Sequence, residues 1–322
     1  MSDLTIGICG VAYALPAQRR SLSELGTLAQ LASEPALLER FGFSQVYVAD
    51  VESPYSLALT ATKQLLDEQN AVPESIDALI YCGTPTVAFA ASGSAGDAAG
   101  RLSTAQRFSY PATRLQYDLG LDQASTLALD QLACTSLFAA VRMARALILA
   151  GDARRVLCVS SEFFPQCAGR EAIYNVTGDA ACALLVDAGA ERNRIVTSMQ
   201  VTKGYYWDAD ALTNEIVASY FPTAKHVMAE TLARAGWTPN DVRWVLPHNV
   251  STRSWEILLG LTGIPRERLW SRNIARIGHT LAGDNFINLR DAIDEGSVQH
   301  GDKLLLFSYG YGAHWTALAV EA

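Results

Sequence analysis

The sequence predicts an α/β protein made of two related halves, and two observations support this. Short apolar runs alternate with segments whose apolar residues recur at helical spacing, which is typical of helices covering a buried, largely parallel sheet. The segment from Pro73 to Cys82 also matches the segment from Pro239 to His248 in length and in its order of Pro turn and strand. A repeat of this kind indicates an internal duplication.

The elements of the first half follow from these patterns in chain order. Residues 87–106 are rich in Ala, Gly and Ser without a clear period, and we expect a loop or a loose helical insertion there. A Gly151-Asp152 turn leads into the last strand of this half. The expected strands are 5–11, 76–82 and 155–159, and the expected helices are 56–70 and 135–149.

The second half repeats this order of elements. A helix precedes the Pro239 turn, the strand after it ends at His248, and a Gly301-Asp302 turn leads into the last long strand. We therefore predict two units, residues 1–188 with the candidate nucleophile and residues 189–322 with the candidate imidazoles. The expected helices are 225–235, one from about 251, and 286–293, and the expected final strand is 304–307.

Composition excludes several classes of protein. Of 322 residues, 50% are hydrophobic and 18% are charged, which indicates a compact core rather than disorder. The net charge of −8 provides no basic field for nucleic acid or an anionic membrane. Arg142 and Arg145 interrupt the most apolar helix, so we predict no membrane span. Without a visible secretory signal, and with six cysteines far apart in the chain, we expect a reduced cytoplasmic protein.

Cys134 is the candidate nucleophile. It lies between small residues directly before a strong helical pattern, and a thiol at a helix N-terminus is stabilised as the thiolate. Such a cysteine suits acyl transfer, because the thioester that it forms is still reactive. A core cysteine at a helix start is the alternative. The other five cysteines lack this context and are assigned to packing.

Two histidines and an aspartate could complete the site. His248 follows an apolar strand and could act as acid, base or hydrogen-bond donor. If the halves are related by a pseudo-twofold axis, the loop of Cys134 matches the loop of His279, so both imidazoles converge on the sulfur. Asp284 could cap the helix that follows, or it could orient a histidine as the third member of a Cys-His-Asp set. We expect it to orient His248, and His279 competes for the same role.

The closing glycines suggest an anion site. Gly310 and Gly312 follow the last long strand, where glycines allow the backbone to approach a ligand and direct amides at an oxyanion. This pattern is not a dinucleotide fingerprint. No spacing typical of metal ligands is present, so we predict no metal and no tightly bound cofactor.

Five short motifs are distributed along the chain. They are Gln131-Leu-Ala-Cys-Thr-Ser136, Thr177-Gly-Asp-Ala-Ala-Cys-Ala183, Pro247-His-Asn249, Ile277-Gly-His-Thr280 and Tyr309-Gly-Tyr-Gly-Ala-His-Trp315. Together they resemble the thiolase superfamily, and most closely the β-ketoacyl-carrier-protein synthase III family. The resemblance covers nearly the whole chain and implies two pseudo-twofold α/β halves in five α-β-α-β-α layers.

The resemblance implies roles for these residues. Cys134 would take the acyl group from a phosphopantetheine thioester, and His248 would assist. The amides of Cys134 and of the Gly310–Gly312 turn would hold the thioester oxygen. The family is typically a homodimer in which one residue crosses to the partner's pocket, and Tyr110 occupies that place here.

Departures from the family bear on the reaction but leave two branches open. His279 stands where the condensing synthases carry Asn, with Asp284 close behind. This is similar to the Cys-His-Asp branch that acylates small acceptors in natural-product biosynthesis, and a His at this place is also similar to the Cys-His-His condensing enzymes. The family's coenzyme A clasp is not evident around 32–42, which favours an acyl carrier protein as donor. We therefore expect an acyltransferase acting on a small-molecule acceptor. Decarboxylative Claisen condensation is the first alternative, and a non-catalytic partner subunit is the second.

Overall fold

The computed structural model describes residues 4–83, 110–165 and 167–322, so the expected loop at 87–106 lies outside the described residues. Its centre is a nine-stranded sheet with the strand order β11-β12-β13-β10-β1-β9-β6-β4-β5. The order is symmetric about the middle: β1 and β10 lie side by side, β9 and β13 flank them, and β6 and β12 follow. This symmetry is what the repeat in the sequence predicts.

The strands join in both directions. Parallel pairs link β4 to β5, β4 to β6 and β11 to β12, whereas β1, β9, β10 and β13 make antiparallel pairs. The expectation of a largely parallel sheet is therefore wrong. The strands are β1 (Ile6–Ala14), β4 (Ala78–Gly83), β5 (Ser125–Leu129), β6 (Arg155–Glu162), β9 (Ala180–Ala188), β10 (Arg194–Thr202), β11 (Trp244–Pro247), β12 (Lys303–Gly310) and β13 (His314–Glu321).

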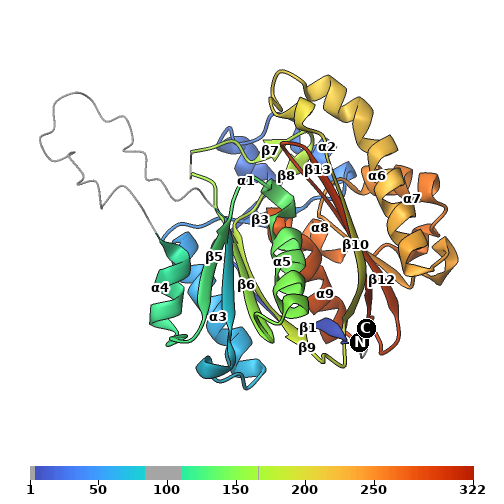
Figure 1. The fold of residues 1–322 in the computed structure, drawn as a ribbon. Coiled ribbons are helices and arrows are strands. Elements are labelled where there is room, and N and C mark those ends of the chain that lie inside the picture. Colours follow the sequence, from blue (N-terminus) through green and yellow to red (C-terminus); the bar gives the residue numbers. More distant parts are fainter. Residues whose placement is uncertain (1–3, 84–109, 166) are drawn as a thin grey trace, which may run out of the picture.

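Five layers of structure result from this sheet and its helices. Helices α5 (Ser136–Ala150) and α9 (Asp284–Asp294) lie between the two parts of the sheet (Figure 1). Their apolar faces share one core, in which Phe138 and Phe286 are in contact with ring centroids 5.2 Å apart. Helix α3 (Pro54–Glu68) covers the outer face of the first part, and α6 (Thr213–Ala235) covers that of the second. This is the predicted α-β-α-β-α arrangement.

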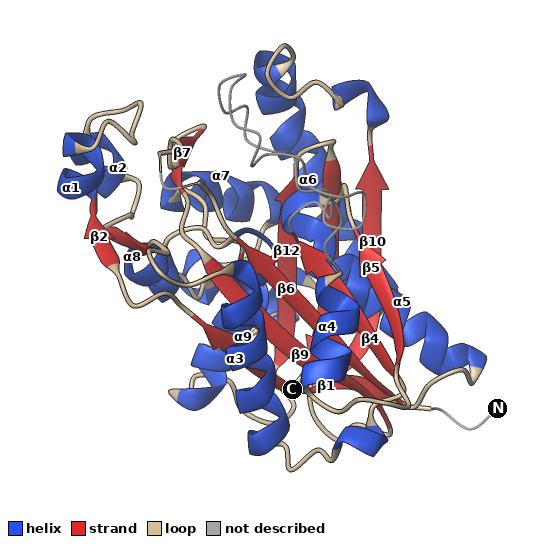
Figure 2. Ribbon diagram, turned by 90° about the vertical axis from the view of Figure 1, so that its left-hand side faces the viewer, coloured by secondary structure: helices blue, strands red, loops and turns tan. Residues whose placement is uncertain are grey.

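Shorter elements complete the fold, and Figure 2 shows several of them outside the main sheet. Two small two-stranded sheets, one of β2 and β3 and one of β7 and β8, are separate from the main sheet. The remaining elements are α1 (Leu22–Thr27), α2 (Pro35–Arg40), α4 (Pro111–Asp118), α7 (Thr252–Thr262), α8 (Arg272–Ile277), β2 (Arg19–Ser21), β3 (Gln45–Tyr47), β7 (Glu171–Ala172) and β8 (Asn175–Val176), with 3-10 turns η1 (Pro73–Ser75), η4 (Ala133–Thr135), η5 (Gly204–Tyr206), η6 (Pro239–Asp241), η7 (Arg266–Arg268) and η8 (Leu281–Gly283).

The repeat is visible at the level of turns. Both Pro turns, η1 and η6, precede a buried strand, and α5 and α9 occupy equivalent places before β6 and β12. The helical segment Ala133–Ala150, which joins η4 to α5, is long and apolar enough to cross a membrane by length and composition alone. Its apolar face, including Leu137, Val141 and Ile148, is buried in the core instead. The expected boundary after residue 188 falls at the end of β9 and stays a prediction.

Candidate active site

Cys134 lies in a tight turn that leads into α5. The turn is the 3-10 element η4, and α5 begins two residues after the cysteine. Gln131 and Ala133 adopt positive φ angles of 63° and 44°, which cost energy for residues with a Cβ and are found mainly where a side chain must be aimed. The thiol therefore lies at the positive end of the helix dipole, as predicted.

His279 contacts the sulfur directly. Its Nε2 atom is 3.3 Å from Sγ of Cys134, and its Nδ1 atom is 2.5 Å from Oδ2 of Asp284. The Asp284 carboxylate also accepts hydrogen bonds from the backbone N–H and hydroxyl of Thr280 and from the backbone N–H of Asn249. Because all of these groups are buried, the carboxylate is fixed and aligns the imidazole with the sulfur.

The expectation that Asp284 orients His248 is wrong. Asp284 lies five residues after His279, and the turn η8 folds it back onto that ring. Nor does it cap α9, which begins at Asp284 itself and has no side-chain cap bond. The His248 ring lies in an aromatic environment, with centroids 5.6 Å from Trp255, 5.8 Å from Phe307 and 6.1 Å from His279. Its buried Nδ1 atom has no hydrogen-bond partner among the described residues.

The two imidazoles have opposite electrostatic properties. Burial alone would lower the pKa of His279, but the adjacent Asp284 carboxylate and the Cys134 sulfur outweigh it and raise that pKa well above its ordinary value. Burial, together with the charge of His279, lowers the pKa of His248 from 6.5 to about 3. His279 is therefore cationic beside the sulfur at neutral pH, whereas His248 is neutral.

Glu162 is a further acid near this pair that the sequence pattern did not reveal. It is the last residue of β6. Burial and the nearby Asp130 raise the pKa of its carboxyl to about 7, and His279 partly opposes this shift. The carboxyl therefore titrates close to neutral pH and lies within the electrostatic field of the imidazolium.

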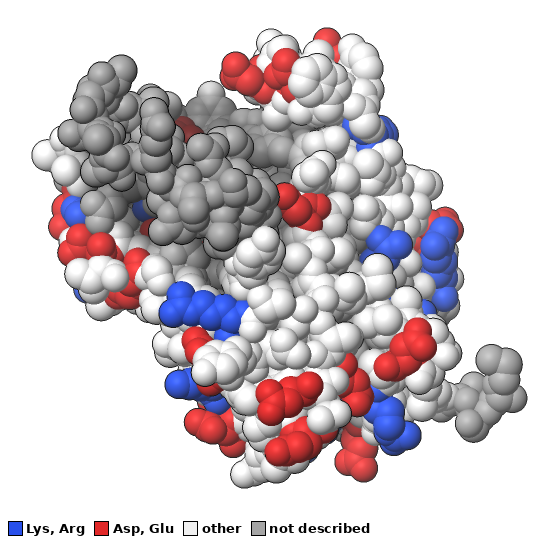
Figure 3. All heavy atoms as spheres, turned by 60° about the vertical axis from the view of Figure 1, so that its left-hand side comes forward, with Lys and Arg blue, Asp and Glu red and all other residues white. Residues whose placement is uncertain are grey.

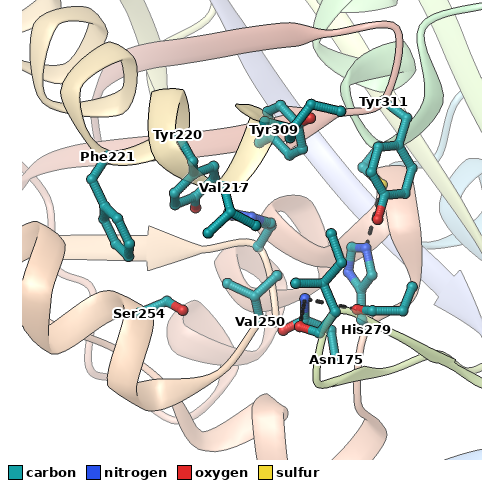
Figure 4. A pocket seen from close by; sticks show the side chains of 14 residues that line it. Asn175, Val217, Tyr220, Phe221, Val250, Ser254, His279, Tyr309 and Tyr311 are labelled. Carbon is teal, nitrogen blue, oxygen red and sulfur yellow. Dashed lines mark hydrogen bonds between the residues drawn. The ribbon is translucent and has the colours of Figure 1, made fainter. Parts of the chain in front are cut away.

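A pocket of about 140 Å³ leads from the surface to Cys134. Its inner part includes His248 and His279, and its outer part includes Ile173, Val217 and Tyr311, which are 37%, 45% and 37% exposed. Figure 4 shows the Tyr311 ring above His279, with residues of α6 on the opposite wall. The pocket is lined by Cys134, Ala172, Ile173, Asn175, Ile216, Val217, Tyr220, Phe221, His248, Val250, Ser254, His279, Tyr309 and Tyr311.

The closing glycines allow β12 to approach the nucleophile. A Cβ atom on Gly310 would come within 2.6 Å of the Leu132 carbonyl oxygen and 3.1 Å of the Cys134 backbone nitrogen. Gly310 and Gly312 do not line the pocket themselves; the tyrosines at 309 and 311 do. The hydroxyl of Ser308 also donates a hydrogen bond to the Cys134 carbonyl at 3.0 Å. The strand and the nucleophile turn are therefore held together.

The polar face of α9 is a support that sequence reasoning missed. Asn288 donates to the Pro247 carbonyl and to the Asn249 side chain, and Asn249 donates to the Gly278 carbonyl. Asn285 donates to the carbonyls of Leu246 and Phe307. A pattern in the sequence could have predicted this polar face, because Asp284, Asn288 and Asp291 recur at helical spacing in a helix that packs against the core.

Other predicted residues lie outside this cluster. Tyr110 is 65% exposed at the start of α4 and does not line the pocket of its own chain. Cys167 is exposed, so its assignment to packing is wrong. In the described ranges no group of three or more His, Cys, Asp or Glu side chains could hold a metal ion, and the cysteines there form no disulfide.

The fold and site together define an acyl-transferring enzyme of the thiolase type. Two family profiles match the chain: 3-oxoacyl-[acyl-carrier-protein] synthase III over residues 130–204, and the C-terminal part of the same family over residues 232–322. The chain belongs to the β-ketoacyl-acyl-carrier-protein synthase III-like proteins of the thiolase superfamily. Enzymes of this type carry the acyl group on a cysteine, so a non-catalytic subunit does not agree with the comparisons.

Individual relatives are distant but cover nearly the whole chain. The β-ketoacyl-[acyl-carrier-protein] synthase III of Aquifex aeolicus is 26% identical over 301 residues, which cover 90% of this chain and 91% of that protein. A crystal structure from the same organism has a TM-score of 0.83 at 24% identity and covers 98% and 100% of the two chains. The structure of ChlB3, described as an acyltransferase, has a TM-score of 0.82 at 20% identity and covers 99% and 98%. The solved structures establish the fold.

Proposed function

We propose that the protein is a ping-pong acyltransferase that acts through Cys134 with His279 and Asp284. In the first half-reaction the Cys134 thiolate attacks the carbonyl carbon of an acyl thioester and forms a new carbon–sulfur bond. Backbone amides beside Cys134 and Gly310 hold the oxyanion, as in oxyanion holes generally. The bond to the donor sulfur breaks, and the departing thiolate takes the proton from the His279 imidazolium.

The second half-reaction uses the same groups in reverse. His279 is now neutral and accepts the proton of an acceptor hydroxyl or amine as its oxygen or nitrogen attacks the acyl carbon. The carbon–sulfur bond to Cys134 breaks and restores the thiolate beside an imidazolium. Asp284 stabilises that imidazolium and holds its ring in place, which is the role of the third member of a catalytic triad.

A single observation supports this proposal most strongly: one imidazole bridges the nucleophile and a buried carboxylate, at 3.3 and 2.5 Å. To test it, acetyl- and malonyl-carrier proteins are incubated with the protein, which is then weighed intact. We expect one acyl group on Cys134 and its transfer when alcohols or amines are added. Cys167→Ser, which changes an exposed cysteine, is the matched control and should acylate normally. An acyl-enzyme that releases its acyl group to no oxygen or nitrogen nucleophile would defeat the acyltransferase proposal.

The second candidate is decarboxylative condensation, and the names of the relatives favour it. These proteins are β-ketoacyl-[acyl-carrier-protein] synthases III, and the ring centroids of His248 and His279 lie 6.1 Å apart, where both imidazoles could contact one thioester oxygen. In this mechanism a malonyl thioester loses carbon dioxide. The resulting carbanion forms a carbon–carbon bond to the acyl-Cys134 carbonyl as the bond from that carbonyl to the sulfur breaks, and Cys134 leaves as the thiolate. Carbon dioxide release that is lost in His279→Ala but kept in Asp284→Asn would select this candidate.

We propose a carrier-protein thioester as the donor. The mouth of the pocket is apolar, with Ile173 and Val217 exposed, and suits a pantetheine arm. In the region where the family holds coenzyme A, Glu171 accepts hydrogen bonds from the backbone of Ala32 and from the backbone and hydroxyl of Ser33. A carboxylate there disfavours the phosphates of coenzyme A by charge repulsion.

We also propose that the protein is a homodimer through the edge strand β5. Within the described residues this strand pairs only with β4, and unpaired edges are pairing sites for another chain. Leu127 on β5 and Met143 on α5 are 39% and 40% exposed. The face turned forward in Figure 3 has a broad uncharged area among scattered charges of both signs. In such a dimer Tyr110 would approach the partner's pocket. The cytoplasmic location of the protein stays a prediction.

A further inference from the structure

Tyr309 lines the pocket and carries a polar atom that the proposed mechanism does not use. It lies near the end of β12 and lines the same pocket as Cys134. Its hydroxyl oxygen is buried and has no hydrogen-bond partner among the described residues. Buried polar groups are nearly always paired in folded proteins, so an unpaired one needs a specific explanation. A phenylalanine at this position would pack as well without that cost.

The hydroxyl cannot easily reach another partner, because aromatic rings hold the side chain on three sides. Its ring centroid is 5.3 Å from that of Tyr220 at an interplanar angle of 90°, 4.9 Å from Trp315 and 6.0 Å from Tyr311. Figure 4 shows Tyr220 and Tyr309 together on one wall of the pocket. The oxygen is therefore a fixed feature of that wall.

The Tyr309 hydroxyl stays protonated in the pocket that it shares with the reacting sulfur. Burial raises the pKa of Tyr309 above its ordinary value, and the negative charges that Tyr311 and Cys134 can carry raise it further. The electrostatic effect of Cys134 reaches Tyr311 as well. At neutral pH the phenol can therefore both donate and accept a hydrogen bond next to any molecule attached to the cysteine.

We infer that the Tyr309 hydroxyl is a specificity-determining contact to one neutral hydroxyl or amide group of the molecule that reacts at Cys134. This inference rests on the proposed function and narrows its substrate class. None of the described residues that line the pocket is Asp, Glu, Lys or Arg. The charge of the one cation among these described residues, the His279 ring, is already balanced by its contact with Asp284, so a charged group would find no free counter-ion. A pocket of about 140 Å³ is close in size to a cavity that holds benzene. The substrate portion next to Cys134 is therefore one ring or a short chain bearing a hydrogen-bonding group.

Matched alkylating probes test this inference without requiring acyl transfer. In each chloroacetamide the Cys134 sulfur bonds to the methylene carbon as the carbon–chlorine bond breaks and chloride leaves. One pair compares an N-cyclohexyl with an N-(4-hydroxycyclohexyl) chloroacetamide. The other compares an N-pentyl chloroacetamide with an N-(2-acetamidoethyl) chloroacetamide, which mimics the pantetheine amide. The second-order inactivation rate is measured for the wild type, Tyr309→Phe and the control Tyr117→Phe, whose side chain is exposed outside the pocket.

We expect the wild type and Tyr117→Phe to prefer the polar member of at least one pair by about tenfold, and Tyr309→Phe to lose that preference. The pair that responds tells whether the group belongs to the acceptor or to the pantetheine arm. Equal preferences in the wild type and Tyr309→Phe for both pairs would overturn the inference. So would a Tyr309→Phe variant that melts below the wild type, because the hydroxyl would then be structural.

The outcome is distinguishable from failure of the proposed function. Alkylation needs only a reactive thiol and an open pocket. A protein that shows the probe preference but transfers no acyl group would leave the inference in place and refute the acyltransferase proposal. A protein that transfers acyl groups but shows no probe preference would support the acyltransferase proposal and refute the inference about Tyr309.

Discussion

At the scale of single residues, the position of Asp284 determines which imidazole can act as a base. Its carboxylate contacts His279 and has no contact with the His248 ring, although it accepts a hydrogen bond from the backbone next to His248. The two histidines consequently differ in charge at neutral pH, even though both lie in one pocket with Cys134. The His279 imidazolium can give up a proton and take it back in the proposed mechanism, whereas the low pKa of His248 makes its neutral ring a weak base that mainly donates or accepts a hydrogen bond.

The first prediction concerns Asp284→Asn. Without the carboxylate the imidazolium loses its main stabilising charge, so the pKa of His279 falls and the ring is less well aligned. We expect kcat for acyl transfer to drop by roughly 10²-fold or more, with the melting temperature changed much less than kcat. Steady-state kinetics and thermal melts check this. A variant that keeps half of the wild-type kcat would show that Asp284 does not act through His279.

The second prediction concerns acid stability and His248. Its pKa is about 3 in the folded protein against an ordinary 6.5, so the unfolded chain binds a proton between these values and the folded protein does not. The unfolding free energy is therefore not reduced by His248 above pH 6.5. As the pH falls from 6.5 toward 3, the proton that only the unfolded chain binds lowers this free energy by about 1.4 kcal/mol per pH unit. His279 has a raised pKa, so it has the opposite effect on the unfolding free energy. Its contribution is fully present below pH 6.5 and is lost as the pH rises above that value.

Urea unfolding of His248→Gln between pH 6.5 and pH 4 provides the test. The unfolding free energy of the variant should depend less steeply on pH than that of the wild type. The difference in slope should be about that caused by one proton, roughly 1.4 kcal/mol per pH unit. His300→Gln, which changes an exposed histidine, should behave like the wild type. Parallel curves for the wild type and His248→Gln would show that the imidazole is not buried in the neutral form.

The convergence of Cys134 and His279 followed from the sequence repeat, but the partner of Asp284 did not. Equivalent loops before α5 and α9 meet at the pseudo-symmetry axis, so a matched repeat was enough to bring those loops together. Which imidazole receives the carboxylate depends on the backbone path of a single turn, η8, that residue types do not specify. Glu162 was missed for a related reason, because only its tertiary environment distinguishes it from a surface acid.

At the scale of secondary elements, α9 supports the site through its buried polar face. Asn288 is fully buried and is hydrogen-bonded to Asn249 and the Pro247 carbonyl. It thus joins α9 to the end of β11, directly before His248. This arrangement positions His248, while Asp284 at the start of the same helix positions His279.

The third prediction tests this support. Asn288→Leu removes the donor from two buried acceptors, so we expect a loss of about 3 kcal/mol in unfolding free energy. Asp294→Asn, at the exposed end of the same helix, breaks only a surface ion pair with Arg290 and should cost less than about 1 kcal/mol. Chemical denaturation of the two variants compares them. Equal losses would show that the polar face of α9 carries no special role.

At the scale of secondary elements, the main error of the sequence prediction was the direction of the strands. Strands 5–11, 76–82 and 155–159 exist with small shifts at their ends, and so do the predicted helices, although α6 begins at Thr213 rather than Lys225. The sheet is nevertheless mixed, because β9, β10 and β13 return antiparallel beside β1, β6 and β12. Fully buried strands are apolar on both faces in either direction, so periodicity could not reveal this.

At the scale of the whole molecule, the symmetric sheet leaves β5 at one edge and β11 at the other. An exposed edge with apolar neighbours favours pairing with a second copy. In the proposed dimer, Tyr110 would also approach the active site of the partner, so that assembly would add a residue to the pocket.

The fourth prediction follows from this edge. Light scattering should give a mass near twice the 34.7 kDa of the chain, and Leu127→Lys on β5 should reduce it toward the monomer. Leu28→Lys, at an exposed apolar position at the end of α1, should leave the mass unchanged. A wild-type protein that stays monomeric at micromolar concentrations would rule out the proposed dimer.

The most direct test of the account is the fate of an acyl group in His279→Ala and His248→Ala, measured by intact mass followed by peptide mapping. The account predicts that the wild type carries one acyl group on Cys134 and releases it to an added nucleophile. His279→Ala should acylate slowly and release the group at least about 100-fold more slowly, with a smaller effect in His248→Ala. An acyl group on another residue, or a larger loss in His248→Ala than in His279→Ala, would contradict it.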